Sequence, residues 1–563
     1  MQNKLKSVFD FAKKCFLCRD AAVFVLCLTG AGFLSVWLEQ ELMSDFLSYH
    51  YYNGFAFLNN RLGFDIAPAQ TGTFYNPLLD TLLYLTDDFF STKRSYLFAA
   101  GVPAGLALFF VYKIADLFFP ERKKLWIPLC LAISLTGYAF YRQIGTCTHE
   151  ITTACFVLGA FYILLKRPAG AVWYFIAGAI LGSAAGLKLT AALYCVSSGI
   201  TLILFYKTLE KPKMFIGAFI LGGLTGFLLT NGFWMWTLWK QFQNPFFPFW
   251  NKIFKSPYFF DVNYRDDLHL SYDWKKMLFL PFRIFAGNII DLSGKEIVDK
   301  ELTSRASFSD ARWMVGYFLL FFFALKSFGR DFRASVSEKT YFTVTFMVVS
   351  YLVWLLLSQN VRLTVPVEML FGVVFIKALS SCPYPKTFFK EVASGSAVLV
   401  LYFILLSTPF FSDPWGPFRR FSVPDDAVLP EKALILTSGP RSSYFATKFA
   451  ERTDARIINS GTRTFLNYSD LSDYNRFLEE KKEILDKNML PVLFIVTVKD
   501  KDTRFEIKDN VCYLMNVNRL IGFGEEFAFC SRPKIINGIF HNGRLSKDEK
   551  DAVETRDLSA DIR

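Results

Sequence analysis

Apolar stretches of about 20 residues alternate with short polar segments along the chain up to residue 411. A helix that crosses the hydrocarbon core of a bilayer needs about 20 such residues. The pattern therefore predicts eleven membrane-spanning helices, near residues 21–40, 95–117, 125–142, 150–166, 171–187, 189–206, 214–237, 311–328, 340–358, 364–380 and 392–411. A further apolar stretch, residues 75–86, is shorter and contains Pro77 and Asp80.

The basic residues between these stretches predict the orientation of the chain. Residues 1–20 are basic and are expected in the cytoplasm. If residues 75–86 are re-entrant or interfacial, each later basic cluster also faces the cytoplasm, at 122–124, 166–167, 207–213, 326–333 and 386–390. If residues 75–86 spanned the membrane, these clusters would face outward. We therefore expect two large external loops, 41–94 and 238–310, and an external, periplasmic C-terminus.

Composition supports the membrane interpretation. Hydrophobic residues make up 53% of the 563 residues and charged residues 20%, whereas soluble domains contain about 45–50% and about 25%. The formal net charge of +12 arises from the clusters that the positive-inside rule requires. No basic stripe or recognition module accompanies it, so nucleic-acid binding is excluded.

Polarity rises after residue 411. Segments 432–438, 490–498 and 511–517 have the pattern of buried strands, and 470–487 is a charged amphipathic helix. We expect a small external α/β domain over 412–540 and a disordered tail over 541–563. Cys512 and Cys530 are the two cysteines that could pair if this region is external.

The first external loop combines a carboxylate with aromatic side chains. In a regular helix, Asp45, Tyr49 and Tyr52 would share one face, next to His50, and Asn76 follows in the same loop. Aromatic rings stack on the apolar faces of sugars, and a carboxylate can accept a hydroxyl proton. The alternative is an ordinary interfacial aromatic belt with a solvated aspartate.

Other candidate residues lie at predicted helix ends. His149 and Glu150 begin the helix at 150–166, where Glu150 could also be a plain helix cap. Lys188 and Arg362 lie near the external surface, and the alternative for both is snorkelling to the interface. Arg265 lies in the second long loop and could equally belong to a solvated turn.

Several short motifs resemble the GT-C superfamily, in particular family 87-like and mannosyltransferase-like membrane transferases. They follow one another in order over residues 20–380: Asp45-x-x-x-Tyr49 with Asn53 and Gly54, the run 75–78, the Gly-rich stretch 178–191, the segment 243–257, and the stretch 358–370, where Leu363 departs from the usual Tyr. Together they identify the chain as a GT-C-like, α-helical polytopic protein of the inner (plasma) membrane.

The resemblance implies a glycosyltransferase that uses a polyprenyl-phosphate sugar as donor and inverts the sugar. It implies Asp45 as the general base, Glu150 as a second acidic residue of the catalytic site that orients the acceptor or helps to hold a divalent cation, and Lys188 and Arg362 as cations for the lipid phosphate. Whether a divalent cation takes part is left open by the residues. The acceptor would be a glycan, a lipid or a protein.

Two other functions remain as alternatives. An envelope-polysaccharide polymerase or ligase also has many spans and large external loops, but relies on external arginines and typically has no Asp-x-x-x-Tyr stretch. A transporter would show paired half-repeats or broken helices in corresponding places, and the sequence shows no such pairing.

Overall fold

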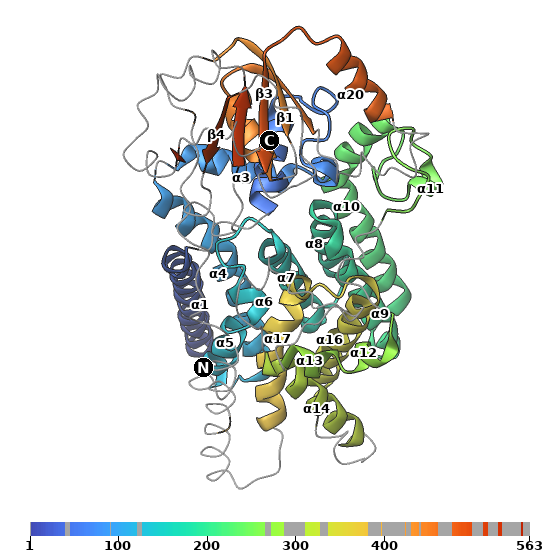
Figure 1. Cartoon of the computed structure of the whole chain (residues 1–563). Helices are drawn as coiled ribbons and strands as arrows, with labels where there is room; N and C mark the ends of the chain where they lie inside the picture. The colour runs from blue at the N-terminus through green and yellow to red at the C-terminus, as the bar shows by residue number, and fades with distance from the viewer. Residues whose placement is uncertain are drawn as a thin grey trace. The chain divides into compact units, whose positions relative to one another are not determined.

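The computed structural model of the chain (Figure 1) describes residues 2–39, 45–90, 92–120, 126–264, 272–285, 310–326, 336–380, 396, 423, 429–437, 441–459, 476–497, 511–515, 527–531 and 553–554. The chain forms two compact units. Unit 1 comprises 1–38, 97–230 and 266–412, and unit 2 comprises 39–96, 231–265 and 413–563. Each unit is therefore assembled from segments that are far apart in the sequence.

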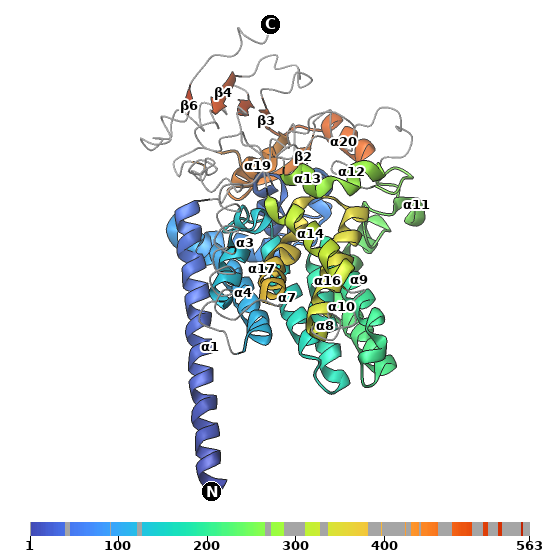
Figure 2. The ribbon, with the colours of Figure 1, turned by 90° about the horizontal axis from the view of Figure 1, so that it is seen from below.

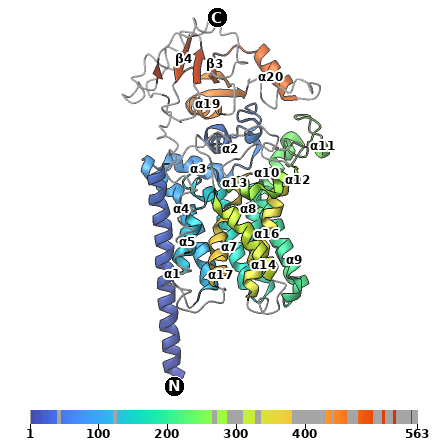
Figure 3. The ribbon, with the colours of Figure 1, turned by 60° about the horizontal axis from the view of Figure 1, so that its bottom comes forward.

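Unit 1 is helical, and in Figure 3 most of its longer helices run roughly parallel. Figure 2 shows α1 as one long helix. The helices are α1 Gln2–Leu38, α4 Lys93–Phe118, α5 Trp126–Leu135, α6 Tyr138–Tyr141, α7 Glu150–Lys166, α8 Ala171–Leu187, η3 Leu189–Ala191, α9 Ala192–Leu204, η4 Tyr206–Thr208, α10 Pro212–Phe242, α12 Trp274–Leu278, α13 Leu280–Phe285, α14 Ala311–Lys326, α16 Glu338–Leu357, η5 Val361–Thr364 and α17 Val365–Ser380. The first residues of α4 and the last turns of α10 belong to unit 2.

Five described helical stretches are long and apolar enough to cross a membrane: Arg19–Leu38, Lys93–Phe118, Pro212–Phe242, Glu338–Leu357 and Val361–Ser380. Four shorter apolar helices lie at Trp126–Leu135, Ala171–Leu187, Leu189–Leu204 and Ala311–Phe321. The expected span at 392–411 lies almost wholly outside the described residues. The number of eleven spans therefore stays a prediction.

The expected continuous helix at 125–142 is wrong, because the chain breaks between α5 and α6. At the break, Arg312 donates to the carbonyl oxygens of Ile133 at 3.1 Å and Thr136 at 2.5 Å. The Glu368 carboxylate accepts from the backbone N–H of Phe140 at 2.9 Å. A cation thus meets the end of α5 and an anion the start of α6, which the helix dipoles favour.

The Gly-rich stretch of α8 is a packing surface for α10. A Cβ at Gly178 would lie 2.0 Å from the Phe219 carbonyl oxygen, and a Cβ at Gly182 would lie 1.9 Å from that of Gly223. Each contact is far too close for any larger residue. Small residues four apart let membrane helices approach backbone to backbone, so this motif has a structural explanation.

Unit 2 contains a six-stranded mixed sheet in the order β2-β1-β3-β5-β4-β6. Its strands are β1 Lys432–Thr437, β2 Asp454–Asn459, β3 Val492–Thr497, β4 Val511–Met515, β5 Phe527–Ser531 and β6 Val553–Glu554, and its helices are η1 Phe46–His50, α2 Tyr51–Leu58, η2 Gln70–Phe74, α3 Leu78–Phe89, α11 Asn251–Phe254, α19 Ser442–Ala450 and α20 Arg476–Asp486. The pairs β1–β2 and β1–β3 are parallel, and the other strand pairs are antiparallel. The predicted strands at 432–438, 490–498 and 511–517 correspond to β1, β3 and β4. The predicted disordered tail lies outside the described residues, apart from β6.

The first long loop packs directly on this sheet. Ile66 forms a parallel bridge to Ile458 at the outer edge of β2. Beside it, Asp65 is ion-paired with Arg61 at 2.7 Å and accepts the backbone N–H of Ile457 at 2.8 Å. Both charged side chains are buried, and a buried pair of this kind needs further hydrogen bonds to offset its desolvation. The C-terminal region and the first loop thus form one unit.

The motif at 243–257 folds as a tight structural loop in the same unit. The Asn251 amide donates to the carbonyl oxygens of Ser256, Phe259 and Phe260 at 2.9–3.0 Å, and its oxygen accepts the Ser256 N–H. The Asn244 amide donates to the Phe249 carbonyl oxygen at 2.9 Å. The asparagines of the motif therefore hold the backbone of the loop.

Candidate functional site

Asp45 stands at the start of a π-helical turn in unit 2. The turn covers η1, immediately before α2, and Asp45 itself is helical and half-buried. Tyr49 lies in the same turn, with its ring 4.2 Å from that of His50 and 5.2 Å, edge to face, from that of Tyr75. Turns of this kind are rare and occur often at functional sites. Asp45 thus lies on the same turn as two rings of a small aromatic cluster.

His50 forms a buried dyad with Asp80. Nδ1 of His50 lies 2.6 Å from Oδ1 of Asp80, and both side chains are 4% exposed. The Asn53 amide donates to the other Asp80 oxygen at 3.1 Å and to the Gly72 carbonyl oxygen at 2.9 Å. The dyad fixes the orientation of the imidazole, because the carboxylate contacts only one of its two nitrogens.

Tyr52 and Asn76 have structural partners in unit 2. Tyr52 is 1% exposed, and its hydroxyl donates to Asp65 at 3.0 Å. Burial raises the pKa of Tyr52 well above its usual value, and the nearby Asp65 carboxylate adds to this effect. Asn76 accepts the Leu78 N–H and donates to Asn231 at 3.1 Å. The π-helical turn breaks the 3.6-residue spacing, so the expected shared face of Asp45, Tyr49 and Tyr52 does not follow.

In unit 1, Glu150 and Lys188 form an ion pair. The Lys188 ammonium lies 2.6 Å from Oε1 of Glu150 and also donates to the Thr148 carbonyl oxygen. The Glu150 side chain is 5% exposed and that of Lys188 is 20% exposed. Oε2 of Glu150 is buried and makes no hydrogen bond to the described residues. Lys188 follows the last residue of α8, so the pair joins the ends of two helices.

Arg362 adds a second cation near the Glu150 carboxylate, on which it acts electrostatically. It lies in η5, where Gln143 donates to its carbonyl oxygen at 3.2 Å. His149, directly before Glu150, has a left-handed backbone with a φ of 63°. Such a conformation is uncommon outside glycine and often marks a functional site. The structure thus brings three separately predicted residues of unit 1 together.

The sequence analysis did not propose two residues of the His50 cluster as site residues, and one residue that it did propose lies outside the described part of the chain. Asp80 was noted only as a polar interruption of an apolar stretch, and Asn53 only as part of a motif. A carboxylate inside an amphipathic segment was the available signal. Arg265 lies outside the described residues, so its role as a substrate contact stays a prediction.

These two clusters can do different chemistry. The paired cations near Glu150 can neutralise an anionic group such as a phosphate. In the other cluster, the Asp45 carboxylate can accept a hydroxyl proton, and the neighbouring aromatic rings can stack on a sugar. His50 and Asp80 are also residue types that bind divalent cations.

The fold is similar to that of ArnT from Cupriavidus metallidurans. The crystal structure of ArnT bound to undecaprenyl phosphate matches with a TM-score of 0.50 and 12% identity, over 94% of this chain and 99% of that chain. The apo structure of ArnT matches with a TM-score of 0.50 and 11% identity, over 95% and 100%. An oligosaccharyltransferase of Archaeoglobus fulgidus tethered with an acceptor peptide gives a TM-score of 0.45 and 13% identity, over 84% and 69%.

Neither a scan against protein-family models nor a search of curated proteins gives a significant match. The likeness to ArnT therefore concerns the fold. It confirms the prediction of a mostly α-helical fold with several apolar helices of membrane-spanning length and a small α/β region.

Proposed function

We propose that this protein is a membrane glycosyltransferase that moves a sugar from a polyprenyl-phosphate donor to a glycan, lipid or protein acceptor. The transfer takes place on the external face of the inner membrane and inverts the sugar. The observation that carries the proposal is the cluster of Glu150, Lys188 and Arg362, two cations around a buried carboxylate. Three ionisable groups among apolar helices are costly, and in membrane proteins they mark functional sites.

A lipid phosphate is the anion that this cluster fits best. The donor in such a reaction stays in the bilayer, and its phosphate leaves as the sugar is transferred. Lys188 and Arg362 would neutralise the charge that develops on that phosphate. ArnT, with a similar fold, binds undecaprenyl phosphate, which supports this class of donor by analogy of fold.

The remaining groups have roles at the acceptor. Asp45 would take the proton from the attacking hydroxyl group, so that the oxygen can displace the phosphate from the sugar. Tyr49, with His50 and Tyr75 beside it, would offer ring faces to a sugar. Glu150, held by Lys188, would orient the acceptor hydroxyl through its second oxygen.

A donor panel tests the proposal. The purified protein, in lipid nanodiscs, is incubated with polyprenyl-phosphate sugars and with a crude envelope fraction as acceptor. We expect one donor to be consumed and the free polyprenyl phosphate to be released. If no donor in the panel is consumed while lipid-linked oligosaccharide is joined into longer chains, the polymerase alternative is favoured.

Asp45→Asn tests the assignment of the base. General-base assistance contributes about 10²–10⁴-fold, so this nearly isosteric change should remove almost all turnover. Asp454→Asn is the matched control in the same unit, since its side chain is 62% exposed in a loose pair with Lys432. A well-folded Asp45→Asn protein with parental turnover would overturn the assignment.

A further inference from the structure

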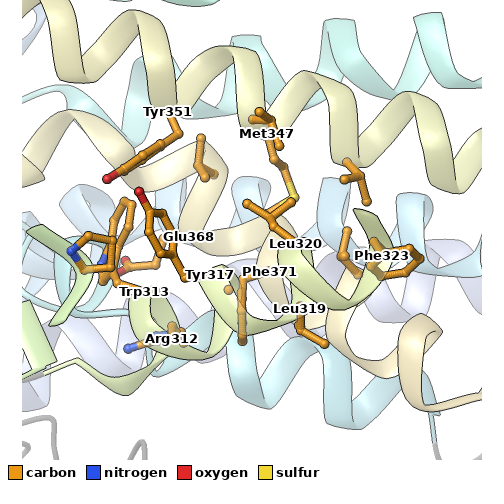
Figure 4. A pocket seen from close by; sticks show the side chains of 16 residues that line it. Arg312, Trp313, Tyr317, Leu319, Leu320, Phe323, Met347, Tyr351, Glu368 and Phe371 are labelled. Carbon is orange, nitrogen blue, oxygen red and sulfur yellow. The ribbon is translucent and has the colours of Figure 1, made fainter. Parts of the chain in front are cut away.

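Unit 1 contains a cavity that the proposed reaction does not use. It lies among α14, α16 and α17, is partly open to its surroundings, and has a volume of about 720 Å³ that includes space continuous with the outside. Figure 4 shows its aromatic and aliphatic side chains, with Tyr317, Leu320 and Phe323 on α14 and Met347 and Tyr351 on α16. Its lining is almost entirely apolar, as in pockets that hold hydrophobic ligands.

The charged residues that line the cavity already have ion-pair or hydrogen-bond partners within the protein. Arg312 is paired with Asp310 at 2.7 Å and donates to two backbone carbonyl oxygens. Glu368 accepts two backbone N–H groups at the start of α6. Neither group offers a free charge, so an ionic headgroup gains little by entering the cavity. The chemistry of the lining favours a hydrocarbon chain.

We infer that this cavity binds one acyl chain of a bilayer phospholipid, which remains with the protein as a structural lipid. The same helices also carry large exposed apolar side chains. Phe318 and Phe321 on α14 are 58% and 64% exposed, and Leu352 on α16 is 49% exposed. In a membrane these side chains contact lipid, so the source of a chain is adjacent. Phospholipid far exceeds any carrier lipid in a bilayer, and mass action favours it.

Two glycines, one lining the cavity and one on an exposed helix surface, offer a matched test of the inference. At Gly316 a Cβ would lie 3.6 Å from the Phe371 ring, an ordinary contact, so Gly316→Leu would extend into the cavity. At Gly217, an exposed position of α10, nothing lies within 4 Å of a Cβ, so Gly217→Leu makes the same chemical change at a lipid-facing surface. Val348→Phe fills the cavity from α16 and serves as a second variant if Gly316→Leu does not fold.

Native mass spectrometry in mild detergent, followed by lipid extraction, reads out the result. We expect about one phospholipid per chain on the parental protein and on Gly217→Leu. Filling the space of two methylene groups should already weaken binding about tenfold, so Gly316→Leu and Val348→Phe should lose the lipid. The inference is overturned if the parental protein retains no lipid, if a polyprenyl phosphate is retained in its place, or if the folded filling variants keep the phospholipid. Donor consumption plays no part in this readout, so its outcome is independent of the proposed reaction.

Discussion

The pair of Glu150 and Lys188 can be separated into its structural and its chemical contributions. Lys188→Met leaves the Glu150 carboxylate buried without its ammonium partner at 2.6 Å. Removing one member of a buried ion pair costs about 3–5 kcal/mol. The Lys188 side chain is 20% exposed, so we expect the low end, about 3 kcal/mol. Lys188→Met should therefore unfold at a clearly lower temperature than the parental protein.

The double variant Glu150→Gln/Lys188→Met removes both charges of the pair, so no member of it is left buried without its partner. Replacing both members of a buried pair is often nearly neutral for stability, so most of the lost unfolding temperature should return. Donor consumption should not return, because one of the two cations proposed for the phosphate is still missing. Lys255→Met is the control, since Lys255 and its partner Asp261 are 67% and 61% exposed and such surface pairs contribute little.

Thermal unfolding in detergent and donor consumption are measured on all four proteins. The result that refutes the reasoning is a double variant that recovers both its unfolding temperature and parental turnover. The pair would then be a structural contact between α7 and α8 alone. An unchanged unfolding temperature in Lys188→Met would show that the buried pair does not form.

Three further predictions concern unit 2. Asp80→Asn removes the carboxylate that holds His50 in a buried site; we expect a loss of about 1–3 kcal/mol in stability, and an unchanged thermal melt would argue against the dyad. The register of β4 and β5 places Cys512 opposite Cys530, within the Cα separation that disulfides span; peptide mapping without reductant should find them joined, whereas two free thiols in protein from the native envelope would speak against an external location. A reporter that is active only outside the cytoplasm should work when fused to the C-terminus, and activity of a cytoplasm-only reporter there would reverse the topology.

The sequence predicted the parts whose signal is local. Apolar runs of helical length predicted most helices of unit 1, and the runs at 432–438, 490–498 and 511–517 predicted β1, β3 and β4, because buried strands are short and continuously apolar. β2 escaped detection, since half of its six residues are polar or charged. Its outer neighbour is Ile66, nearly 400 residues earlier in the chain. No window of sequence contains both partners.

The candidate site divides in the same way. Lys188 and Arg362 could be found because a cation at the end of an apolar helix is unusual by itself. Their convergence on Glu150 could not be found, since the residues of the pair are 38 positions apart and meet only through helix packing. The break between α5 and α6 was missed for a similar reason. Nothing in the sequence near Gly137 indicates that Glu368 packs against it. A Cβ at position 137 would lie only 2.4 Å from the Glu368 carboxylate, so only glycine fits there.

The chain segments that make up unit 2 constrain the membrane topology in a way that hydropathy alone does not. Its three segments, 39–96, 231–265 and 413–563, pack into one compact unit, and a compact unit outside the bilayer lies on one side of it. The chain must then cross the membrane an even number of times between successive segments. The predicted spans satisfy this condition, with six between the first and second segments and four between the second and third. The helix α3 lies within the first segment. If α3 spanned the membrane, the residues before it would lie on the opposite side of the bilayer from β2. Two of these residues, Asp65 and Ile66, are hydrogen-bonded to β2. The packing of unit 2 therefore favours the interfacial alternative for this helix, and it requires the C-terminal region to lie on whichever side the first long loop occupies.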